Sequence, residues 1–490
     1  MEATPAGTRC ERSKRAAPLF APLSKFSAIF SVCVCVIKGD SHIYVPQELR
    51  KDFYTKPGRH FMRNHNMVPT IDVDEYRLTI CGAGMKETVF TLEELKRNFE
   101  KVEITSVIQC NGNRREDYHY LDGKTPAFGP PHWVCGAIGC SRWAGVRLRD
   151  LYRAAGMDVD GISLGRVDAP KNAVHVGLLA MDCDEVGNQY CCSFPFEKSV
   201  DPFGDVIVAY EMNGKDIPRG HGYPVRCIVP GNAGARNCKY LERVTVTDSP
   251  CNENSNWKQY AVHSPDTPLV KLLDFGEHKK ELELDQAVQQ MPVQSFVTMP
   301  SANDVLSAKM GLDEDGDYSV WVEGIAWGGG GQAVNRVDVS VDGGKNFCRA
   351  DMLESECTSL GKPVKQRYGS QWAWVFFEKR VKLPAEMAEK VKRGEKIDLE
   401  VCSKALNGAW NVQPEKPTAN WNAHGCCVNH WYRVPCVYDT KADADIRYQP
   451  DEAAGEFANK PSGGKFARPF NNVDLPDVAK KRGNKELCID

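Results

Sequence analysis

The sequence predicts an α+β protein in two parts, a mostly-β first part built from short mixed elements and a β-sandwich second part. Between residues 91 and 109, a capped amphipathic helix is followed directly by an apolar strand. After Met299, alternating strands recur without long helical periods between them. The length of 490 residues agrees with this division, because a single core rarely serves a chain of that size.

A capping box opens the first expected helix, since Thr91 is followed three residues later by Glu94. A strand over 102–109 follows at once and delivers Cys110 to its end. A second helix is expected over 147–155, and a glycine would cap its C-terminus. Loops rich in glycine, proline and asparagine are expected to dominate from there to about residue 240.

The second part carries clear strand patterns. Valines alternate with polar residues over 337–342 and run into Asp-Gly-Gly, which is typical of a half-buried strand entering a hairpin. Further strands are expected over 372–377 and 397–402, and together they favour a β-sandwich. The predicted domains therefore span 43–295 and 296–440.

The two ends of the chain differ from the rest. Residues 1–42 are basic and include an apolar run shorter than the roughly 20 residues that a bilayer span needs. We interpret them as a targeting or disordered segment, and a mitochondrial presequence, a secretory signal and a mis-assigned gene start all fit. Residues 441–490 are polar and are expected to form a tail. No other stretch is long and apolar enough to span a membrane.

Charge and cysteine content narrow the class of protein. The 62 basic and 65 acidic residues nearly cancel, so no global field would recruit nucleic acid or an anionic membrane. The 20 cysteines are scattered through a large chain without a CxxC pair. This favours a reducing compartment with mostly buried thiols over a disulfide framework.

The most informative thiol is Cys110, which leaves the 102–109 strand into a glycine turn that carries Arg114 and Arg115. Nearby cations favour the thiolate, and thiolates bind soft or high-valent metals. Arg63, His65, Arg226 and Lys239 lie in three other irregular segments. Such residues suit a phosphate-bearing heteroaromatic cofactor, because guanidinium groups match phosphate in bidentate fashion.

Seven segments, in order along about residues 44–440, carry a specific resemblance: Phe61–Pro69, Cys110–Arg115, Gly136–Ile138, Arg142–Gly145, Ala209–Gly214, His221–Arg226 and Asn411–Pro414. They resemble the sulfite oxidase family of molybdenum enzymes. The resemblance implies a molybdopterin-binding domain of mostly-β mixed fold, followed by an immunoglobulin-like dimerisation domain. It also implies two-electron oxidation of sulfite to sulfate, by oxygen-atom transfer at a cysteine-ligated molybdenum–molybdopterin centre.

Residue roles follow from the same resemblance. Cys110 matches the thiolate that ligates molybdenum. Arg63, Arg115 and Trp133 match the substrate pocket, where the arginines would orient an oxyanion and the indole would wall the pocket and donate one hydrogen bond. The neighbouring Arg114 is interpreted as structural. Cofactor contacts are implied for Phe61, Met62, Arg63, Asn64, His65, Asp182, His221, Arg226, Asn237, Cys238 and Lys239.

Two positions depart from the family pattern. Ile325 stands where the family places a pocket tyrosine, so a phenol is missing. His424 stands where its sulfite oxidases place an arginine, so a permanent cation is replaced by a group that titrates near neutrality. We expect weaker anion binding that falls further as pH rises. Nitrate reductases of the superfamily also lack that arginine but keep the tyrosine, so neither branch matches fully.

Three functions therefore stay open at this point: sulfite oxidation, nitrate-reductase-like reduction or another oxyanion substrate, and an impaired homologue that binds molybdopterin or only dimerises. No haem or flavin domain is recognised in this chain, so the electron acceptor would be dioxygen or an external cytochrome. A homodimer is expected. The N-terminal segment favours a mitochondrial location, with the cytosol as the alternative. The insertion over 120–131 is equally consistent with a lid and with a surface loop.

Overall fold

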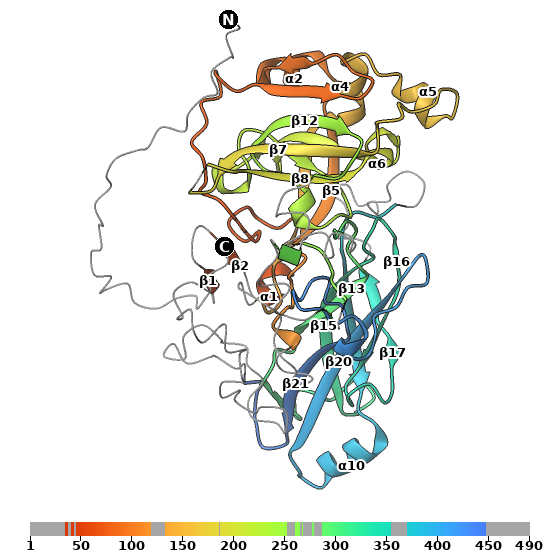
Figure 1. Cartoon of the computed structure of the whole chain (residues 1–490). Coiled ribbons are helices and arrows are strands. Elements are labelled where there is room, and N and C mark those ends of the chain that lie inside the picture. Colours follow the sequence, from red (N-terminus) through yellow and green to blue (C-terminus); the bar gives the residue numbers. More distant parts are fainter. Residues whose placement is uncertain are drawn as a thin grey trace, which may run out of the picture.

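The computed structural model describes residues 35–37, 41–43, 46–118, 133–185, 187–251, 260–264, 267, 277–278, 287–353 and 370–446. These residues form two lobes, with the first part of the chain at the top of Figure 1 and the second below it. The predicted segment 1–42 is described only where β1 (Cys35–Ile37) pairs antiparallel with β2 (Ser41–Ile43). The 120–131 insertion and the tail beyond residue 446 lie outside the described residues.

The first lobe contains two five-stranded sheets. One has the order β10-β9-β6-β5, with β11 also paired to β9, and the other has the order β4-β3-β12-β7-β8. Within the second sheet only β12 and β3 run parallel. The strands are β3 (Leu78–Gly82), β4 (Thr88–Phe90), β5 (Val102–Gln109), β6 (Ile138–Arg147), β7 (His175–Cys183), β8 (Gln189–Pro195), β9 (Ile207–Met212), β10 (Lys215–Asp216), β11 (Arg226–Ile228) and β12 (Leu241–Thr247).

Short helices join these strands, and four of them pack apolar side chains into one core with the β4-β3-β12-β7-β8 sheet. The predicted capping box is confirmed, because the Thr91 side chain accepts from the Glu94 amide while Glu94 accepts from the Thr91 amide. The second expected helix is α4, one residue shorter at each end than predicted. The helices are α1 (Pro46–Leu49), α2 (Leu92–Asn98), α4 (Leu148–Ala154), α5 (Val159–Ser163), α6 (Phe196–Val200), η1 (Arg219–His221) and η2 (Gly234–Arg236).

The expectation that loops dominate up to about residue 240 is wrong. Strands β7, β8, β9 and β11 and helix α6 occupy much of that stretch. Strand β9 is buried on both faces, so its sequence lacks the alternation that marks a half-exposed strand. The glycines and prolines that suggested loops lie between these strands rather than replacing them.

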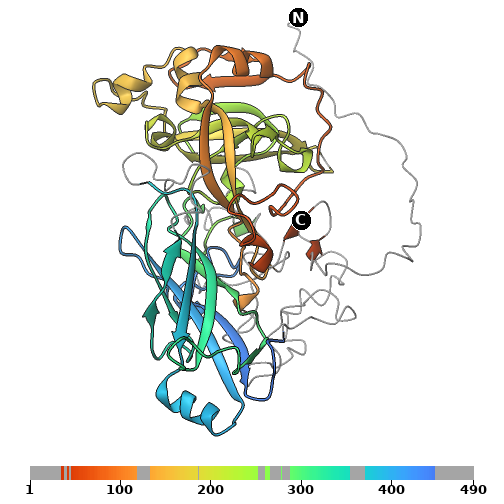
Figure 2. The ribbon, with the colours of Figure 1, turned by 180° about the vertical axis from the view of Figure 1, so that it is seen from behind.

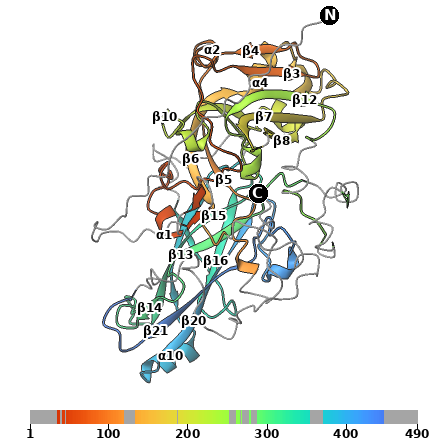
Figure 3. The same ribbon diagram turned by 60° about the vertical axis from the view of Figure 1, so that its left-hand side comes forward.

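The second lobe is a β-sandwich, as predicted. Sheet β13-β15-β19-β18 packs on sheet β14-β21-β20-β16-β17, and valines from both inner faces fill the core between them. Helix α10 lies at the end far from the first lobe (Figure 3). The elements are β13 (Gln294–Met299), β14 (Val305–Ser307), β15 (Ser319–Trp327), β16 (Val334–Ser340), β17 (Cys348–Arg349), β18 (Asp351–Leu353), β19 (Val375–Lys382), α10 (Ala385–Lys392), β20 (Ile397–Asn407), η5 (Pro417–Ala419) and β21 (Tyr432–Asp439).

The first described residues of the predicted tail pack on this sandwich. Ile446 forms an antiparallel bridge with Val305, and the Ser307 hydroxyl donates to the Ala442 carbonyl. None of the helices that the structure describes has the length and apolar character needed to cross a bilayer.

Strands β5 and β6 run from the first lobe towards the second (Figure 2), where Trp372 holds the lobes together. The Val107 amide of β5 donates to the Trp372 carbonyl at 2.8 Å, and the Trp372 indole donates to Asp205 at 2.8 Å. The ammonium of Lys198 lies 4.5 Å above the same ring. Only glycine fits at position 231, because a Cβ there would lie 2.8 Å from the indole.

We expect Trp372→Ala to lower the free energy of unfolding by about 3–5 kcal/mol, because it empties a packed site and leaves the Asp205 contact unmade. Urea unfolding followed by circular dichroism measures the change. The matched control is Trp410→Ala, since Trp410 is 72% exposed whereas Trp372 is 5% exposed. The exposed site should change stability by about 0.5 kcal/mol at most, and equal losses at both positions would contradict the assigned role.

Candidate functional site

A cavity of about 720 Å³, counting its open mouth, lies in the first lobe where four irregular segments meet. Those segments are the loop 60–65, the turn after β5, the stretch from η1 into β11, and the stretch from η2 to Lys239. Among the predicted site residues, the cavity is lined by Phe61, Met62, Arg63, Asn64, His65, Cys110, Asp182, His221, Arg226, Asn237, Cys238 and Lys239. Segments distant in sequence thus converge on one space.

Backbone hydrogen bonds fix Cys110 at this cavity. Its amide donates to the Ala137 carbonyl at 2.9 Å, and its carbonyl accepts from the Asn113 amide at 3.0 Å. The Asn113 side chain then accepts from the amides of residues 136 and 137, which ties the turn to the chain entering β6. The thiol is half-buried at the end of β5. A rigid strand therefore presents one sulfur to the cavity.

Lys239 is a partly buried cation in the cavity wall. Its ammonium donates to the carbonyls of Arg63 at 3.1 Å and Gly220 at 3.3 Å, and also to the Asn64 side chain. Burial is the main cause that lowers the pKa of Lys239 to about 7, and repulsion from Arg226 adds to it. An anion bound in the cavity would restore the charged form.

Arg226 is a second cation in the wall and is buried. Its guanidinium donates to the carbonyls of His221 at 2.7 Å and Asn237 at 2.9 Å and stacks over the Trp143 ring at 4.9 Å. Burial lowers its pKa to about 10. Its Nε atom is buried and has no hydrogen-bond partner among the described residues. A donor of this kind indicates a missing acceptor.

The remaining titratable groups of the wall do not balance these cations. Burial raises the pKa of Asp182 to about 6, so this carboxyl is mostly ionised at pH 7, but it is the single acid in a wall that holds Arg63, Arg226 and Lys239. Burial also lowers the pKa of both His65 and His221 well below the usual value, so both imidazoles are neutral at pH 7. The wall is therefore positive and offers donors, aromatic faces and one thiol.

Two tyrosines in the wall were missed by the sequence reasoning. Tyr190 stacks on His65 with ring centroids 6.1 Å apart, and its hydroxyl donates to the Ala235 carbonyl at 2.7 Å. Tyr260 meets the same imidazole edge-on at 5.6 Å and hydrogen-bonds its Nε2 atom. No motif marks either tyrosine, because only the fold brings them to His65.

Arg115 and Trp133 are not among the residues that line the cavity. The Arg115 guanidinium folds over its own turn, where a Cβ at Gly112 would lie 2.8 Å from it, and it hydrogen-bonds the Cys426 thiol. Trp133 is fully buried in an apolar cluster with Phe61, against which Cys110 packs. The indole N–H of Trp133 has no partner among the described residues.

The two departures from the family pattern also lie outside the wall. Ile325 is fully buried on β15 in an apolar cluster that includes Phe296 and Phe376. His424 is buried next to His263, with ring centroids 5.3 Å apart. Its loop reaches the Cys110 turn, because the Cys427 amide donates to the Asn111 carbonyl at 2.7 Å.

These residues fit a cofactor that carries phosphate and a soft metal. The cavity wall holds three cations, Arg63, Arg226 and Lys239, and one acid, Asp182. An N–H of Arg226 has no acceptor among the described residues, and a thiol faces the same space. Phosphate oxygens would satisfy the cations, and sulfur is a preferred ligand of soft metals.

Comparison with known proteins identifies the family. Residues 65–257 match the family model described as "Oxidoreductase molybdopterin binding domain", and residues 285–438 match "Mo-co oxidoreductase dimerisation domain". The sulfite oxidase of Gallus gallus is 34% identical over 391 residues, a match that covers 79% of this chain and 74% of that protein. The chain belongs to the sulfite oxidase family. The fold class and the family resemblance predicted from the sequence are confirmed.

Other relatives show the breadth of the family. The mitochondrial sulfite oxidase of Rattus norvegicus is 35% identical over 391 residues, and the match covers 79% of this chain but 62% of that protein. The nitrate reductase [NAD(P)H] of Hordeum vulgare is 31% identical over 391 residues, 80% of this chain and 40% of that protein. The chain thus spans only part of the length of these curated relatives.

A solved structure shares the fold. The crystal structure of the sulfane dehydrogenase SoxCD from Paracoccus pantotrophus aligns with a TM-score of 0.59 and 23% identity, over 82% of this chain and 86% of that chain. At this identity the likeness speaks for the fold alone. It places the two lobes of this chain in a known family architecture.

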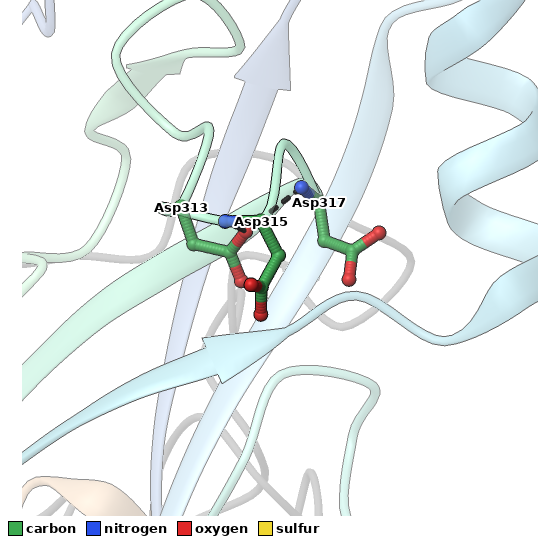
Figure 4. A group of neighbouring side chains, drawn as sticks. All are labelled: Asp313, Asp315 and Asp317. Atoms are coloured by element: carbon green, nitrogen blue, oxygen red, sulfur yellow. Dashed lines mark hydrogen bonds between the residues drawn. The ribbon is translucent and has the colours of Figure 1, made fainter.

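Three acidic side chains cluster outside the cavity, in the turn between β14 and β15. Figure 4 shows Asp313, Asp315 and Asp317 around one turn, where Asp313 accepts from the amides of the other two. The Lys382 ammonium pairs with all three carboxylates at 2.8–3.4 Å. Lys382 already neutralises the cluster, so no cation is needed to explain it.

We expect the destabilising contribution of Lys239 in the cofactor-free protein to shrink as pH rises from about 7 towards 10, so that this one residue makes wild type gain stability relative to a variant without it. Folding lowers the pKa of Lys239 to about 7, whereas an unfolded lysine keeps its proton up to about pH 10.4. The unfolded state therefore binds more protons in this window, and stability rises by about 1.4 kcal/mol per pH unit for one such group. Lys239→Met should remove that contribution, as measured by urea unfolding at several pH values.

The exposed Lys86 supplies the control for this pH series. Its side chain is in solvent in both states, so Lys86→Met should keep the wild-type slope. Arg63, Arg226 and Asp182 face Lys239 and stay unchanged in both variants. If Lys239→Met kept the full slope, the cavity would not be the source of the proton uptake.

Proposed function

We propose that this protein oxidises sulfite to sulfate with a molybdenum–molybdopterin cofactor. The observation that carries the proposal is the placement of Cys110 and Arg63 in one cavity with two further cations, the buried Arg226 and the partly buried Lys239. One wall thus contains a thiol that can bind a soft metal. It also contains cations that can bind a phosphate group and an anionic substrate. Membership of the sulfite oxidase family and the molybdopterin-binding domain model support the same chemistry.

Each part of the wall has a proposed task. Cys110 ligates molybdenum. Arg226 and Lys239 hold the cofactor's phosphate, Asp182 accepts hydrogen bonds from the pterin, and neutral His65 and His221 contact the pterin edge. The other proposed cofactor contacts are Phe61, Met62, Arg63, Asn64, Asn237 and Cys238. When bound, this cofactor supplies two-electron redox chemistry with transfer of an oxygen atom.

Arg63, Arg115 and Trp133 are proposed to serve the substrate. The overall reaction converts sulfite and water to sulfate, with release of two protons and two electrons. The arginines raise the local concentration of the sulfite anion and orient it, and they stabilise charge that moves during the reaction. The fully buried indole of Trp133 keeps water from the apolar side and offers its N–H as a donor.

A second candidate is the reduction of nitrate or another oxyanion. Two observations favour it: the 31% identity to the Hordeum vulgare nitrate reductase and the histidine at position 424 in place of the arginine of sulfite oxidases. A third candidate is an impaired homologue that binds molybdopterin or only dimerises. Ile325 supports this reading, because an isoleucine supplies no phenol to the reaction.

Several features of the whole protein belong to the same proposal. The dimerisation domain over 285–438 supports a homodimer. The electrons pass to dioxygen or to an external cytochrome. The mitochondrial relatives support a mitochondrial location, and the cytosol is the alternative.

One purification separates the three candidates. Protein from a molybdopterin-competent host is expected to contain molybdenum and to reduce ferricyanide or cytochrome c when sulfite is added. Molybdenum without sulfite turnover, but with nitrate-dependent oxidation of a reduced dye, would select the second candidate. Absence of molybdenum would remove both enzymatic candidates.

Arg115→Met should lower kcat/KM for sulfite by about ten- to a hundredfold, because it removes a positive charge from the Cys110 turn, next to the proposed anion site. Most of the loss should appear as a higher KM, since the cation chiefly raises sulfite binding. The matched control is Arg349→Met, an exposed arginine on β17 in the other lobe. Steady-state kinetics at several ionic strengths measure both variants, and equal effects at the two positions would count against a pocket role.

Cys110→Ser should abolish sulfite turnover and also weaken the visible charge-transfer absorption that a thiolate gives to a high-valent metal, because a serine oxygen is a harder ligand. The absorption spectrum of the oxidised protein therefore tests ligation apart from activity. Cys81→Ser is the control, since Cys81 is half-buried on β3, outside the cavity wall. An unchanged spectrum in Cys110→Ser would show that Cys110 is not the ligand.

A further inference from the structure

Cys191 and Cys251 form a close pair of thiols at the edge of the first lobe. Their Sγ atoms lie 2.6 Å apart, although the residues are 60 positions apart in the chain. A disulfide bond is about 2.0 Å long, so a small movement of either side chain would close the gap. Both side chains are half-buried, so a small oxidant can reach them.

The neighbouring cysteine of the strand is differently placed. Cys192 follows Cys191 in β8 but is fully buried in the core, because successive side chains of a strand point to opposite faces. Its thiol hydrogen-bonds Cys238 there. Of Cys191 and Cys192, only Cys191 therefore faces Cys251, which follows the end of β12.

That chain is already attached to β8 by a polar contact. The Cys251 amide donates to the Ser193 hydroxyl at 2.9 Å, and Gln289 donates to the Ser193 carbonyl at 3.1 Å. The backbone at Cys251 is therefore held beside β8 before any covalent link exists. This preorganisation favours an intramolecular bond over reaction with an external thiol.

The two cysteines lie near the two tyrosines in the sequence. Cys191 directly follows Tyr190, which stacks on His65, and Cys251 precedes Tyr260, which meets the same imidazole edge-on, by nine positions. Beyond Tyr260, Ala261 pairs with Ala287 as an isolated bridge. A bond between the two sulfurs would thus link the segments that carry Tyr190 and Tyr260, the two tyrosines that contact His65.

We propose that Cys191 and Cys251 are a redox modification site, at which an oxidant of the peroxide class forms a reversible disulfide that restrains Tyr260 against His65. Two S–H bonds break and one Sγ–Sγ bond forms, with loss of two electrons and two protons. Hydrogen peroxide accepts both, its O–O bond breaks and two water molecules leave. A dithiol reverses the change by thiol–disulfide exchange. The site is independent of the substrate that the cavity binds.

The test uses the full-length protein, reduced with dithiothreitol, freed of it, and treated with hydrogen peroxide. The remaining thiols are blocked with N-ethylmaleimide, and the protein is digested without reduction for mass spectrometry. We expect a peptide pair joined through Cys191 and Cys251, and two fewer blocked thiols than in the reduced protein. Dithiothreitol should restore both.

Matched variants make the assignment specific. Cys191→Ser and Cys251→Ser should each abolish the linked pair, while Cys348→Ser, a half-buried thiol of the second lobe, should keep it. Blocking of both Cys191 and Cys251 in the oxidised native protein would overturn the proposal. A dominant bond between the adjacent Cys191 and Cys192, or separate oxidation of each thiol to its acids, would overturn it as well.

Hydrogen exchange tests the restraint separately from the bond. Amides 260–264 are expected to exchange more slowly in the oxidised than in the reduced wild type, and equally in both states of Cys251→Ser. If the bond forms while these exchange rates stay unchanged, the restraint of Tyr260 is wrong even though the modification site stands.

Discussion

The cost of burying positive charge is the constraint on which the site depends. Arg226 is removed from water and Lys239 is partly so, and the lowered pKa values of both reflect that cost. Four backbone carbonyls, those of Arg63, Gly220, His221 and Asn237, offset part of it. These bonds also shape the loops, because segments without regular structure are held together by the cations that they surround. The wall of the cavity and its charge are thus one structural unit, which an anionic ligand would complete.

His65 illustrates how aromatic contacts complement these charges. The imidazole lies near the cations Arg63 and Lys239 and contacts the phenol rings of Tyr190 and Tyr260. Burial together with repulsion from Arg63 lowers its pKa and keeps it neutral. A neutral ring can accept from one side and donate to the other, whereas a protonated ring would add to the unbalanced charge of the wall. Tyr190 and Tyr260 fix its orientation. The wall therefore gains a directional hydrogen-bonding group without a further cation.

Local patterns made part of this structure predictable from sequence. The Thr91–Glu94 capping box, the 102–109 strand and the strand at the alternating valines of β16 depend on near neighbours, and each appears in the structure. Strand β16 is not half-buried as expected, because Asp338 and Ser340 are buried together with the valines. The cluster of Cys110, Arg63, Arg226 and Lys239 was predicted through their chemistry and the family resemblance, and the structure brings them to one cavity. The domain bounds and the residue roles stay predictions.

The missed features are those that only distant contacts create. Tyr260 and His65 are 195 positions apart, and nothing near either residue marks the contact. Strand β9 is buried on both faces, so alternation could not reveal it. The family resemblance singled out position 325, but it did not predict that Ile325 packs against Phe296 and Phe376. That apolar cluster arises from the packing of strands distant in sequence.

Strand β5 connects the second lobe to the cavity. Its middle is hydrogen-bonded to Trp372 in the second lobe, and its end presents the Cys110 sulfur to the cavity. A substitution that disturbs the packing around Trp372 would therefore reach the Cys110 turn through the backbone of β5. The second lobe can thus influence the position of this sulfur, although the residues that line the cavity all come from the first part of the chain.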